Sequence, residues 1–266
     1  MPRGKLAAET STTSVELSKS SYSFPDATTH VVRNGHFGKT SHYSRYSTFM
    51  SLISIQAPGA VVMIRPHCFH PNPETAADNA FQRCGAEHNN EERAGIAAAA
   101  RNEVTNAAAA LEAAGVRTHV FDDHGESQTP DSVFPNNLFS THPGGHIALY
   151  PMHCANRRRE RRTDLIKMLK ANYRVQDVID YSGLEYDGVF LEGTDAMVLD
   201  HVARVAYTAR SRRADPVALQ RFCTHFNIEP MCFDTYDRAG HAVYHTNVMT
   251  STERSRRSGS NRRRAR

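Results

Sequence analysis

The stretch FLEGTDAMVLDHVARVAYTAR, residues 190–210, repeats the pattern of FPNNLFSTHPGGHIALYPM, residues 134–152. FPNN and FLEG start 56 residues apart, and HIALYPM and RVAYTAR start 58 residues apart. Each copy has the pattern of strand, strand, helix and strand, which predicts an internal repeat. One such copy cannot bury its own sheet, so several copies are expected around an axis. An ordinary doubly wound α/β sheet is the alternative, because its units also alternate strand and helix.

Apolar patterning outside and within the two copies predicts an α/β fold. AVVMIR at 60–65 has the composition of a buried strand. The Ala-rich segment 90–114 has acids in its first turn and is followed by Gly115, as expected of a helix and its end. The remaining elements are expected as strands at 116–123, 133–139, 146–152, 174–180, 196–199, 203–209 and 229–236, and as helices at 158–172 and 216–226.

The two ends of the chain differ in composition from its centre. Residues 1–57 begin rich in Ser, Thr and His without apolar periodicity, and are expected to be a disordered extension. Residues 58–249 are expected to form the domain. Residues 250–266, TSTERSRRSGSNRRRAR, follow a strand-like run abruptly and are interpreted as a disordered tail left by truncation or a frameshift. A nucleic-acid or localisation patch is the functional alternative for this tail.

The net charge of +4 conceals an acidic centre. Residues 254–266 hold seven Arg and no acid, whereas residues 50–253 hold 19 basic and 25 acidic residues. An acidic centre disfavours nucleic acid as the partner and suits a small cationic or zwitterionic ligand. No apolar run is long enough to span a bilayer, so no membrane association is expected.

Cysteine usage indicates a reducing compartment, so a cytoplasmic location is expected. The number of cysteines is odd and none forms a CxxC pair, which disfavours a disulfide framework or a structural zinc site. No metal or other cofactor is expected. The cysteines are Cys68, Cys84, Cys154, Cys223 and Cys232.

Three short polar clusters at predicted strand ends could carry chemistry. The segment 129–137 holds Asp131 with the amides Asn136 and Asn137, although a turn with Asx capping is the simpler explanation for this segment taken alone. Glu192 stands between apolar residues and a glycine, so a buried strand end would require a partner for it, such as a cationic ligand. His245 stands in an otherwise apolar run, where a core histidine with satisfied hydrogen bonds is the alternative.

Arginines are concentrated in NRRRERR, residues 156–162, and in ARSRRAD, residues 209–215. Several Arg in the first turn of a helix oppose its macrodipole, so at least one is expected to have an anionic partner. Arg binds carboxylates bidentately, so either segment could hold the carboxylate of an amino acid. A solvated helix start is the simpler explanation for the first run.

Five separated motifs resemble a known enzyme family. They are MIRPHCFHPNPETAADNAFQ, TPDSVFPNNLFSTH, LYPMHCANRRRERR, FLEGTDAMVLD and YHTNVM, within residues 58–249. They are similar to amidinotransferase-like proteins associated with citrulline-utilisation hydrolases. That family belongs to the pentein superfamily with arginine deiminase, dimethylarginine dimethylaminohydrolase and glycine amidinotransferase. The implied fold is a five-bladed α/β propeller of ββαβ repeats, here without its last blade.

The resemblance also implies a covalent mechanism, in which a Cys thiolate attacks a guanidino or ureido carbon and a His transfers protons. On this basis His245 matches the acid/base, and Glu192 matches the acid that orients it or holds substrate. Asp131 and Asn137, with Asn136 beside it, match a substrate-binding segment. Arg158 and Arg213 match positions facing the substrate carboxylate. The family nucleophile follows the histidine, and no Cys follows Cys232 here, so none is assigned that role.

The predicted function is therefore modification of a C–N bond, other than a peptide bond, in citrulline or an arginine-type amino acid. Relatives that bind a guanidinium commonly have a carboxylate at the position of Asn137, so the amide favours citrulline. The missing nucleophile predicts a chain without useful turnover. A non-catalytic remnant that binds ligand and a nucleic-acid-associated protein with basic ends are the alternatives. Water or an amine as acceptor, and the oligomeric state, are left open.

Overall fold

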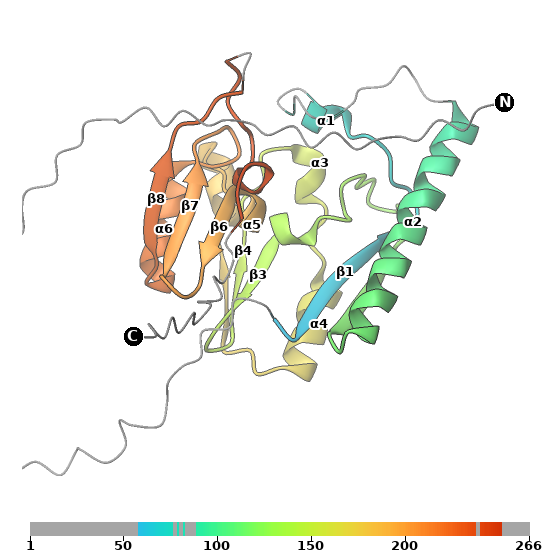
Figure 1. Ribbon diagram of the computed structural model, residues 1–266, viewed down its shortest axis with the longest axis horizontal. Coiled ribbons are helices and arrows are strands. Elements are labelled where there is room, and N and C mark those ends of the chain that lie inside the picture. Colours follow the sequence, from blue (N-terminus) through green and yellow to red (C-terminus); the bar gives the residue numbers. More distant parts are fainter. Residues whose placement is uncertain (1–57, 77–78, 80–81, 83–88, 238–239, 252–266) are drawn as a thin grey trace, which may run out of the picture. The chain divides into compact units, whose positions relative to one another are not determined.

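The computed structural model describes residues 58–76, 79, 82, 89–237 and 240–251, which all lie in the unit Ile55–Arg266 (Figure 1). The segments 1–57 and 252–266, for which disorder was expected, fall outside the described residues. The strands are β1 (Ala60–Pro66), β2 (Arg117–Asp123), β3 (Phe139–His142), β4 (His146–Leu149), β5 (Asp177–Asp180), β6 (Met197–Asp200), β7 (Val205–Ala209) and β8 (Glu229–Phe233). The α-helices are α1 (Pro73–Ala76), α2 (Asn90–Ala113), α3 (Ala155–Arg158), α4 (Thr163–Asn172), α5 (Gly193–Ala196) and α6 (Pro216–Phe226). Three 3-10 helices are η1 (Pro135–Asn137), η2 (Ser182–Asp187) and η3 (Thr246–Val248).

The two sequence copies form two sheets of identical topology. In each, the first two strands are antiparallel and the third, reached through a helix, is parallel to the second: β3-β4-α4-β5 and β6-β7-α6-β8. The described residues thus contain three separate sheets instead of one doubly wound sheet. The order expected from the repeat is therefore present in both copies, while a ring of five blades stays a prediction.

The first sheet contains β1 and β2, parallel to each other and joined through α2. Asn89 begins α2 with a capping box, because its side chain accepts from the Glu92 amide and the Glu92 side chain accepts from the Asn89 amide. Gly115 follows the helix with a φ of 85°, a conformation that glycine adopts without a Cβ penalty. The expected helix at 90–114 therefore matches α2 to within one residue.

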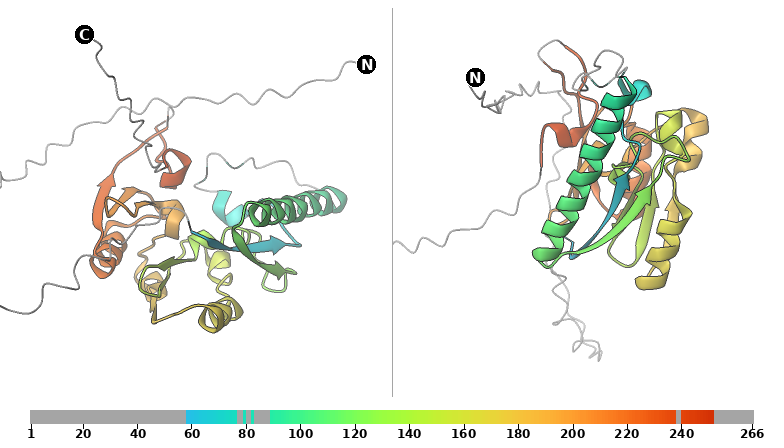
Figure 2. Two further views of the ribbon diagram at one scale, coloured as in Figure 1. Left: turned by 60° about the horizontal axis from the view of Figure 1, so that its bottom comes forward. Right: turned by 90° about the vertical axis from the view of Figure 1, so that its right-hand side faces the viewer.

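Helices α4 and α6 each share an apolar cluster with strands of their own sheet and of the preceding one, and in the right-hand view of Figure 2 the strands lie between α2 and α4. Leu165 and Leu169 of α4 contact Ile64 of β1 together with Phe139 and Ile147 of the second sheet. In the second cluster, Leu219 and Phe222 of α6 pack with Ala148 of β4, Leu199 of β6 and Ala206 of β7. Successive sheets are thereby joined through the apolar faces of amphipathic helices.

Three strands are three residues shorter than expected, at 146–149, 177–180 and 229–233, and two further boundaries are wrong by five residues or more. The strand expected at 133–139 is replaced by η1 and begins only at Phe139, since Pro135 lacks the amide that a strand ladder needs. The helix expected at 158–172 begins at Thr163. In the residues before it, arginine side chains donate to main-chain oxygens. Arg158 donates to the oxygens of Met152 and His153, and Arg161 donates to the oxygen of Tyr150. This segment therefore crosses over the end of β4.

The turn before each first strand brings the copies together. Gly193 at the start of α5 has a φ of 50°, and an added Cβ would lie 2.1 Å from the main-chain oxygen of Asn136 in η1. Thr246 of η3 donates its hydroxyl to the Ala196 oxygen over 2.5 Å and accepts from the Ala209 amide over 2.8 Å. The turns η1, α5 and η3, separated by one repeat each, therefore meet at one place. Among the described residues, no helix is long and apolar enough to cross a membrane.

Candidate active site

A cavity of about 300 Å³ opens where the three turns meet. Its wall includes charged and amide side chains from five separate segments of the chain. These are Asp131, Asn137, Arg157, Asp195, Arg213 and His245. Residues more than one hundred positions apart in sequence therefore share one polar cavity, as expected of a ligand site with a few convergent polar groups.

His245 and Glu192 form a buried pair at this cavity. The Nε2 atom of His245 lies 2.9 Å from Oε2 of Glu192, and Nδ1 lies 3.8 Å from Oδ2 of Asp195. The Glu192 side chain has no exposed surface and also accepts from the His153 amide over 3.1 Å. A carboxylate that holds one ring nitrogen fixes the orientation of the imidazole and leaves the ring able to exchange protons.

Two buried guanidinium groups share the same carboxylate. Oε2 of Glu192 lies 3.4 Å from Nη1 of Arg213 and 3.7 Å from Nη1 of Arg157. Burial opposes ionisation of Glu192, but its hydrogen bond with His245 and the charges of Arg213 and Arg157 lower its pKa to about 2. Glu192 is therefore a carboxylate at neutral pH and neutralises part of two buried cations.

Arg157 connects several groups beneath the cavity. It donates through Nε and Nη2 to the two carboxylate oxygens of Glu160, both over 3.1 Å, and through Nη1 to Oδ1 of Asn137 over 3.0 Å. Burial raises the pKa of Glu160 to about 7, against the opposite influence of the Arg157 charge. The charge of the Arg157–Glu160 pair thus depends on pH near neutrality.

Asp195 in the turn α5 accepts hydrogen bonds from side-chain amides of the other two turns. Asn136 and Asn137 of η1 donate to its two carboxylate oxygens over 2.5 and 2.7 Å, and Asn247 of η3 donates to Oδ1. On the other side of the cavity, Asp131 accepts from Nδ2 of Asn72 over 2.8 Å. Neutral amide donors therefore orient both carboxylates, and Asp131 also lies 3.8 Å from Nε of the buried Arg157.

The structure brings together most of the residues that the sequence indicated. Asp131, Asn137, Arg213 and His245 line the cavity, and Glu192 lies directly behind His245. Asn136 is exposed and bonds to Asp195 outside the lining of this cavity.

Arg158 does not line the cavity, contrary to the expectation that it faces the ligand. It is one-third exposed and pairs with Glu185 over 3.5 Å, while its neighbour Arg157 occupies the cavity wall. Adjacent residues of a helical turn point about 100° apart, so a shift of one residue separates these two positions.

Four polar residues at the site were not assigned a role from the sequence, namely Asn72, Arg157, Glu160 and Asp195. The spacing of Arg157 and Glu160 by three residues indicates an ion pair on one face of a helical turn. Asn72 lies between two prolines in the motif HPNPET, and only the tertiary structure shows that its side chain bonds to Asp131.

None of the four cysteines in the described part of the chain lines the cavity. Cys154 is buried, with its Sγ 3.7 Å from Nδ1 of His153 and 3.6 Å from the Glu74 oxygen. Cys232 lies in β8 and packs against the apolar cluster that includes Phe222. Within the same residues, no group of three or more His, Cys, Asp and Glu side chains could hold a metal ion.

Two ββαβ units thus meet at one polar cavity that holds a buried His–Glu pair and two arginines. Residues 65–255 match the family described as N,N dimethylarginine dimethylhydrolase, eukaryotic. The chain belongs to this family, because the match covers more than half of it. No curated protein sequence matches the chain.

The chain is similar to solved structures of an arginine dihydrolase and of a dimethylarginine dimethylaminohydrolase. An arginine dihydrolase of cyanobacteria, ArgZ, is 14% identical with a TM-score of 0.50, over 69% of this chain and 25% of that one. Its N-terminal domain bound to substrate is 12% identical with a TM-score of 0.47, over 69% of this chain and 60% of that one. A mutant of dimethylarginine dimethylaminohydrolase from Pseudomonas aeruginosa, complexed with citrulline, is 15% identical with a TM-score of 0.46, over 69% of this chain and 62% of that one. The chain thus spans less than two thirds of each of these proteins.

Proposed function

We propose that the cavity binds a free amino acid whose side chain ends in a ureido or guanidino group, as the substrate of a C–N hydrolase site. The buried His245–Glu192 pair beside Arg213 carries this proposal. A site with cationic and anionic groups in one small cavity suits a zwitterion, because each charge of the ligand meets an opposite one. Family membership supports the same class of reaction.

The roles follow from the positions of the charges. Arg213 would hold the ligand carboxylate, since its guanidinium lines the cavity and can bond to two oxygens. Asp131 and Asp195 would accept from the ligand nitrogens. His245 would exchange the proton of the leaving amine or of water, with Glu192 fixing the ring. In the complete reaction a thiolate would attack the carbon, the amine would leave with a proton, and water would then release the thiolate.

Citrulline is the proposed ligand in preference to arginine. Both Asn136 and Asn137 use their amide groups on Asp195, and Asn137 also accepts from Arg157, so part of the acidity of the site is satisfied by neutral donors. A ureido group is neutral and carries an oxygen that needs a donor. Titration calorimetry of the purified chain with both amino acids tests this proposal. Tighter binding of arginine would reject citrulline, and no heat with either amino acid would reject the site.

Binding without turnover is the second candidate, because no described thiol lines the cavity. Covalent catalysis requires a thiolate within reach of the carbon and of His245, and loss of a nucleophile typically lowers a rate by several orders of magnitude. We expect no ornithine or ammonia release from citrulline or arginine by this chain. Turnover abolished by Cys154→Ser or Cys232→Ser would show that one of these thiols is the nucleophile.

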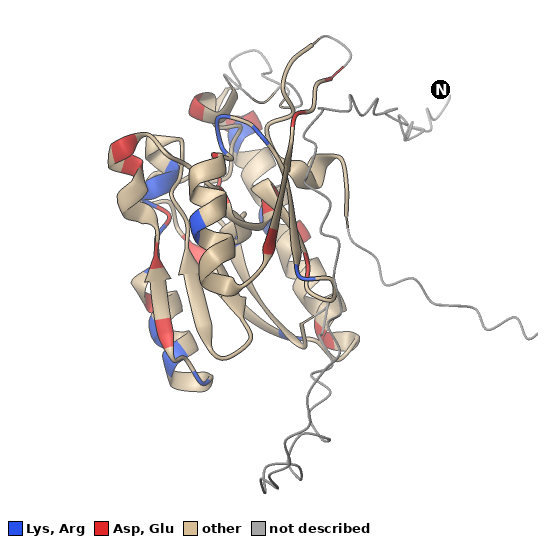
Figure 3. Ribbon diagram, turned by 90° about the vertical axis from the view of Figure 1, so that its left-hand side faces the viewer, with Lys and Arg blue, Asp and Glu red and all other residues tan. Residues whose placement is uncertain are grey.

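A nucleic-acid-associated function rests on the basic residues 254–266, which lie outside the described residues. In the described part, acidic and basic residues alternate along helices and loops in the view of Figure 3, without a continuous basic stripe. Salt-dependent nucleic-acid binding that is lost on deletion of residues 252–266 would favour this function over the amino-acid site.

A further inference from the structure

Glu160 is a buried carboxylate that adjoins the candidate site without lining its cavity. Its two oxygens accept from Nε and Nη2 of Arg157, both over 3.1 Å, in the two-bond arrangement that fits a guanidinium to a carboxylate. Such a pair fixes the plane of the guanidinium, because a rotation would break both bonds. Glu160 therefore determines how Arg157 is presented to the cavity wall.

The remaining terminal nitrogen of Arg157 holds the side chain of Asn137. Nη1 of Arg157 donates to Oδ1 of Asn137 over 3.0 Å, and Nδ2 of Asn137 donates to Oδ2 of Asp195 over 2.7 Å. The reversed amide would place N–H groups against the cation and an oxygen against the carboxylate. Arg157 and Asp195 together fix the orientation of this amide, and Glu160 acts on it through Arg157.

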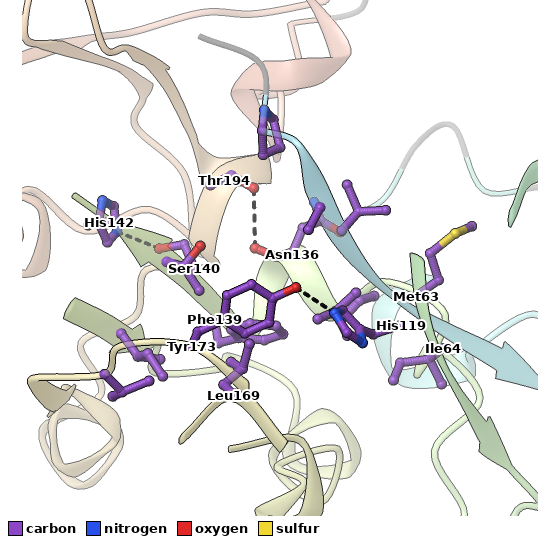
Figure 4. A pocket seen from close by; sticks show the side chains of 18 of the residues that line it. Met63, Ile64, His119, Asn136, Phe139, Ser140, His142, Leu169, Tyr173 and Thr194 are labelled. Atoms are coloured by element: carbon purple, nitrogen blue, oxygen red, sulfur yellow. Dashed lines mark hydrogen bonds between the residues drawn. The ribbon is translucent and has the colours of Figure 1, made fainter. Parts of the chain in front are cut away.

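Asn136, the other amide of the turn η1, lines a different cavity. This second cavity has a volume of about 700 Å³ and is shown in Figure 4, where the main-chain oxygen of Asn136 accepts from the Thr194 hydroxyl over 3.4 Å. No Asp or Glu of the described part of the chain lines it, so it offers no carboxylate to the nitrogens of a ligand. A ligand in the acidic cavity therefore meets Asn137 and the cation that holds it.

We propose that Glu160 is a positioning residue which, through Arg157, sets the preference of the cavity for a neutral ureido group over a cationic guanidino group. This inference rests on the proposed function, in which Asp131 and Asp195 accept from ligand nitrogens. Arg157 belongs to the same wall, since its Nε lies 3.8 Å from Oδ2 of Asp131. A ligand guanidinium would meet a second cation there, whereas a ureido oxygen can accept from one.

The protonation state of Glu160 decides how much of the Arg157 charge is neutralised. Burial raises the pKa of Glu160 to about 7, so both of its states are populated near neutral pH. The other charged groups that face this pair are Asp131, before η1, and Glu192, before α5. Glu192 also bonds to His245, whose own protonation would act on the same ligand. A test must therefore separate Glu160 from these neighbours.

Titration calorimetry with citrulline and with arginine, at pH 5 and at pH 8, tests the inference. The two ligands share their amino and carboxylate groups, so the ratio of the arginine Kd to the citrulline Kd reports on the end of the side chain. At pH 8, Glu160→Gln should raise this ratio at least about fivefold over the wild type, because the charge of Arg157 loses its partner. At pH 5 the two proteins should agree within about twofold, because the wild-type carboxyl group is then protonated.

Glu185→Gln is the matched control, because Glu185 pairs with Arg158 and does not line the cavity. It should change the ratio less than about twofold at either pH. An unchanged ratio for Glu160→Gln at pH 8 would overturn the inference. An equal rise at both pH values would overturn it as well, because a purely structural effect does not follow the charge of Glu160. Absence of binding of either amino acid to the wild type would reject the proposed function and the preference together.

A second readout of the same contacts needs no ligand. The side-chain amide signals of Asn137 in nitrogen-15 NMR spectra, identified by their loss in Asn137→Ser, should shift with a midpoint at a pH of about 7. The shift is expected because ionisation of Glu160 changes the field of Arg157 at this amide. Glu160→Gln should remove this titration step, and Glu185→Gln should retain it. A step that persists in Glu160→Gln would overturn the inference even where both amino acids bind.

Discussion

His245 and Glu192 are joined by a hydrogen bond of 2.9 Å although 53 residues separate them, and both side chains are buried. The bond connects the turn after the third sheet to the turn before it. Glu192 simultaneously serves as the anion for Arg213 and Arg157. Orientation of the histidine and neutralisation of two buried cations therefore depend on the same carboxylate, so the geometry of the candidate site and the stability of the fold are linked at this residue.

Glu192→Gln is expected to destabilise the fold by about 3–5 kcal/mol, because it removes the carboxylate that pairs with the buried Arg213 and one of the anions around the buried Arg157. The urea midpoint of unfolding, followed by circular dichroism, measures the change. Glu103→Gln on the exposed face of α2 removes the same charge and should change stability by less than about 0.5 kcal/mol. Similar midpoints for the two variants would show that the buried charges find other partners.

Gly193→Ala is expected to cost about 2–4 kcal/mol, because the added Cβ would lie 2.1 Å from the main-chain oxygen of Asn136 and φ is 50°. Separation of η1 from α5 should also weaken amino-acid binding, since both turns contribute to the cavity. Gly183→Ala is the matched control, because nothing lies within 4 Å of its added Cβ. Equal thermal stability of the two variants would contradict the close approach.

The repeat and most of the residues that line the candidate cavity can be predicted from the sequence, because apolar periodicity and polar residues at strand ends are local signals. The sequence does not distinguish Arg157 from Arg158, since three consecutive arginines have the same composition and only packing decides which one is buried. Nor does it indicate a role for Asn72, whose contact with Asp131 joins residues 59 positions apart. Hydrogen bonds across such distances are determined by the arrangement of the sheets, so no local pattern shows them.

Glu160 should make stability depend on pH between about 4.5 and 7. Its pKa is raised from 4.5 to about 7 in the folded state by burial. In this window the folded protein therefore binds more protons than the unfolded chain, and stability falls as the pH rises. The loss of folding stability from ionisation of Glu160 should total about 1–3 kcal/mol and should not grow further above pH 7. Urea midpoints at pH 5 and pH 8 test this, with Glu160→Gln expected to lose the difference. If the variant loses as much stability between pH 5 and pH 8 as the wild type, another group causes the pH dependence.

Arg213→Lys should weaken citrulline binding at least about tenfold, or 1.4 kcal/mol, because lysine keeps the charge but cannot bond to both carboxylate oxygens. Arg158→Lys is the control, since Arg158 pairs with Glu185 and does not line the cavity, and it should change affinity less than about twofold. Calorimetry with citrulline amide, which lacks the carboxylate, separates recognition from structural damage. Arg213→Lys should leave the weaker binding of this amide unchanged. An equal loss with citrulline and its amide would show that Arg213 supports the cavity without contacting the carboxylate.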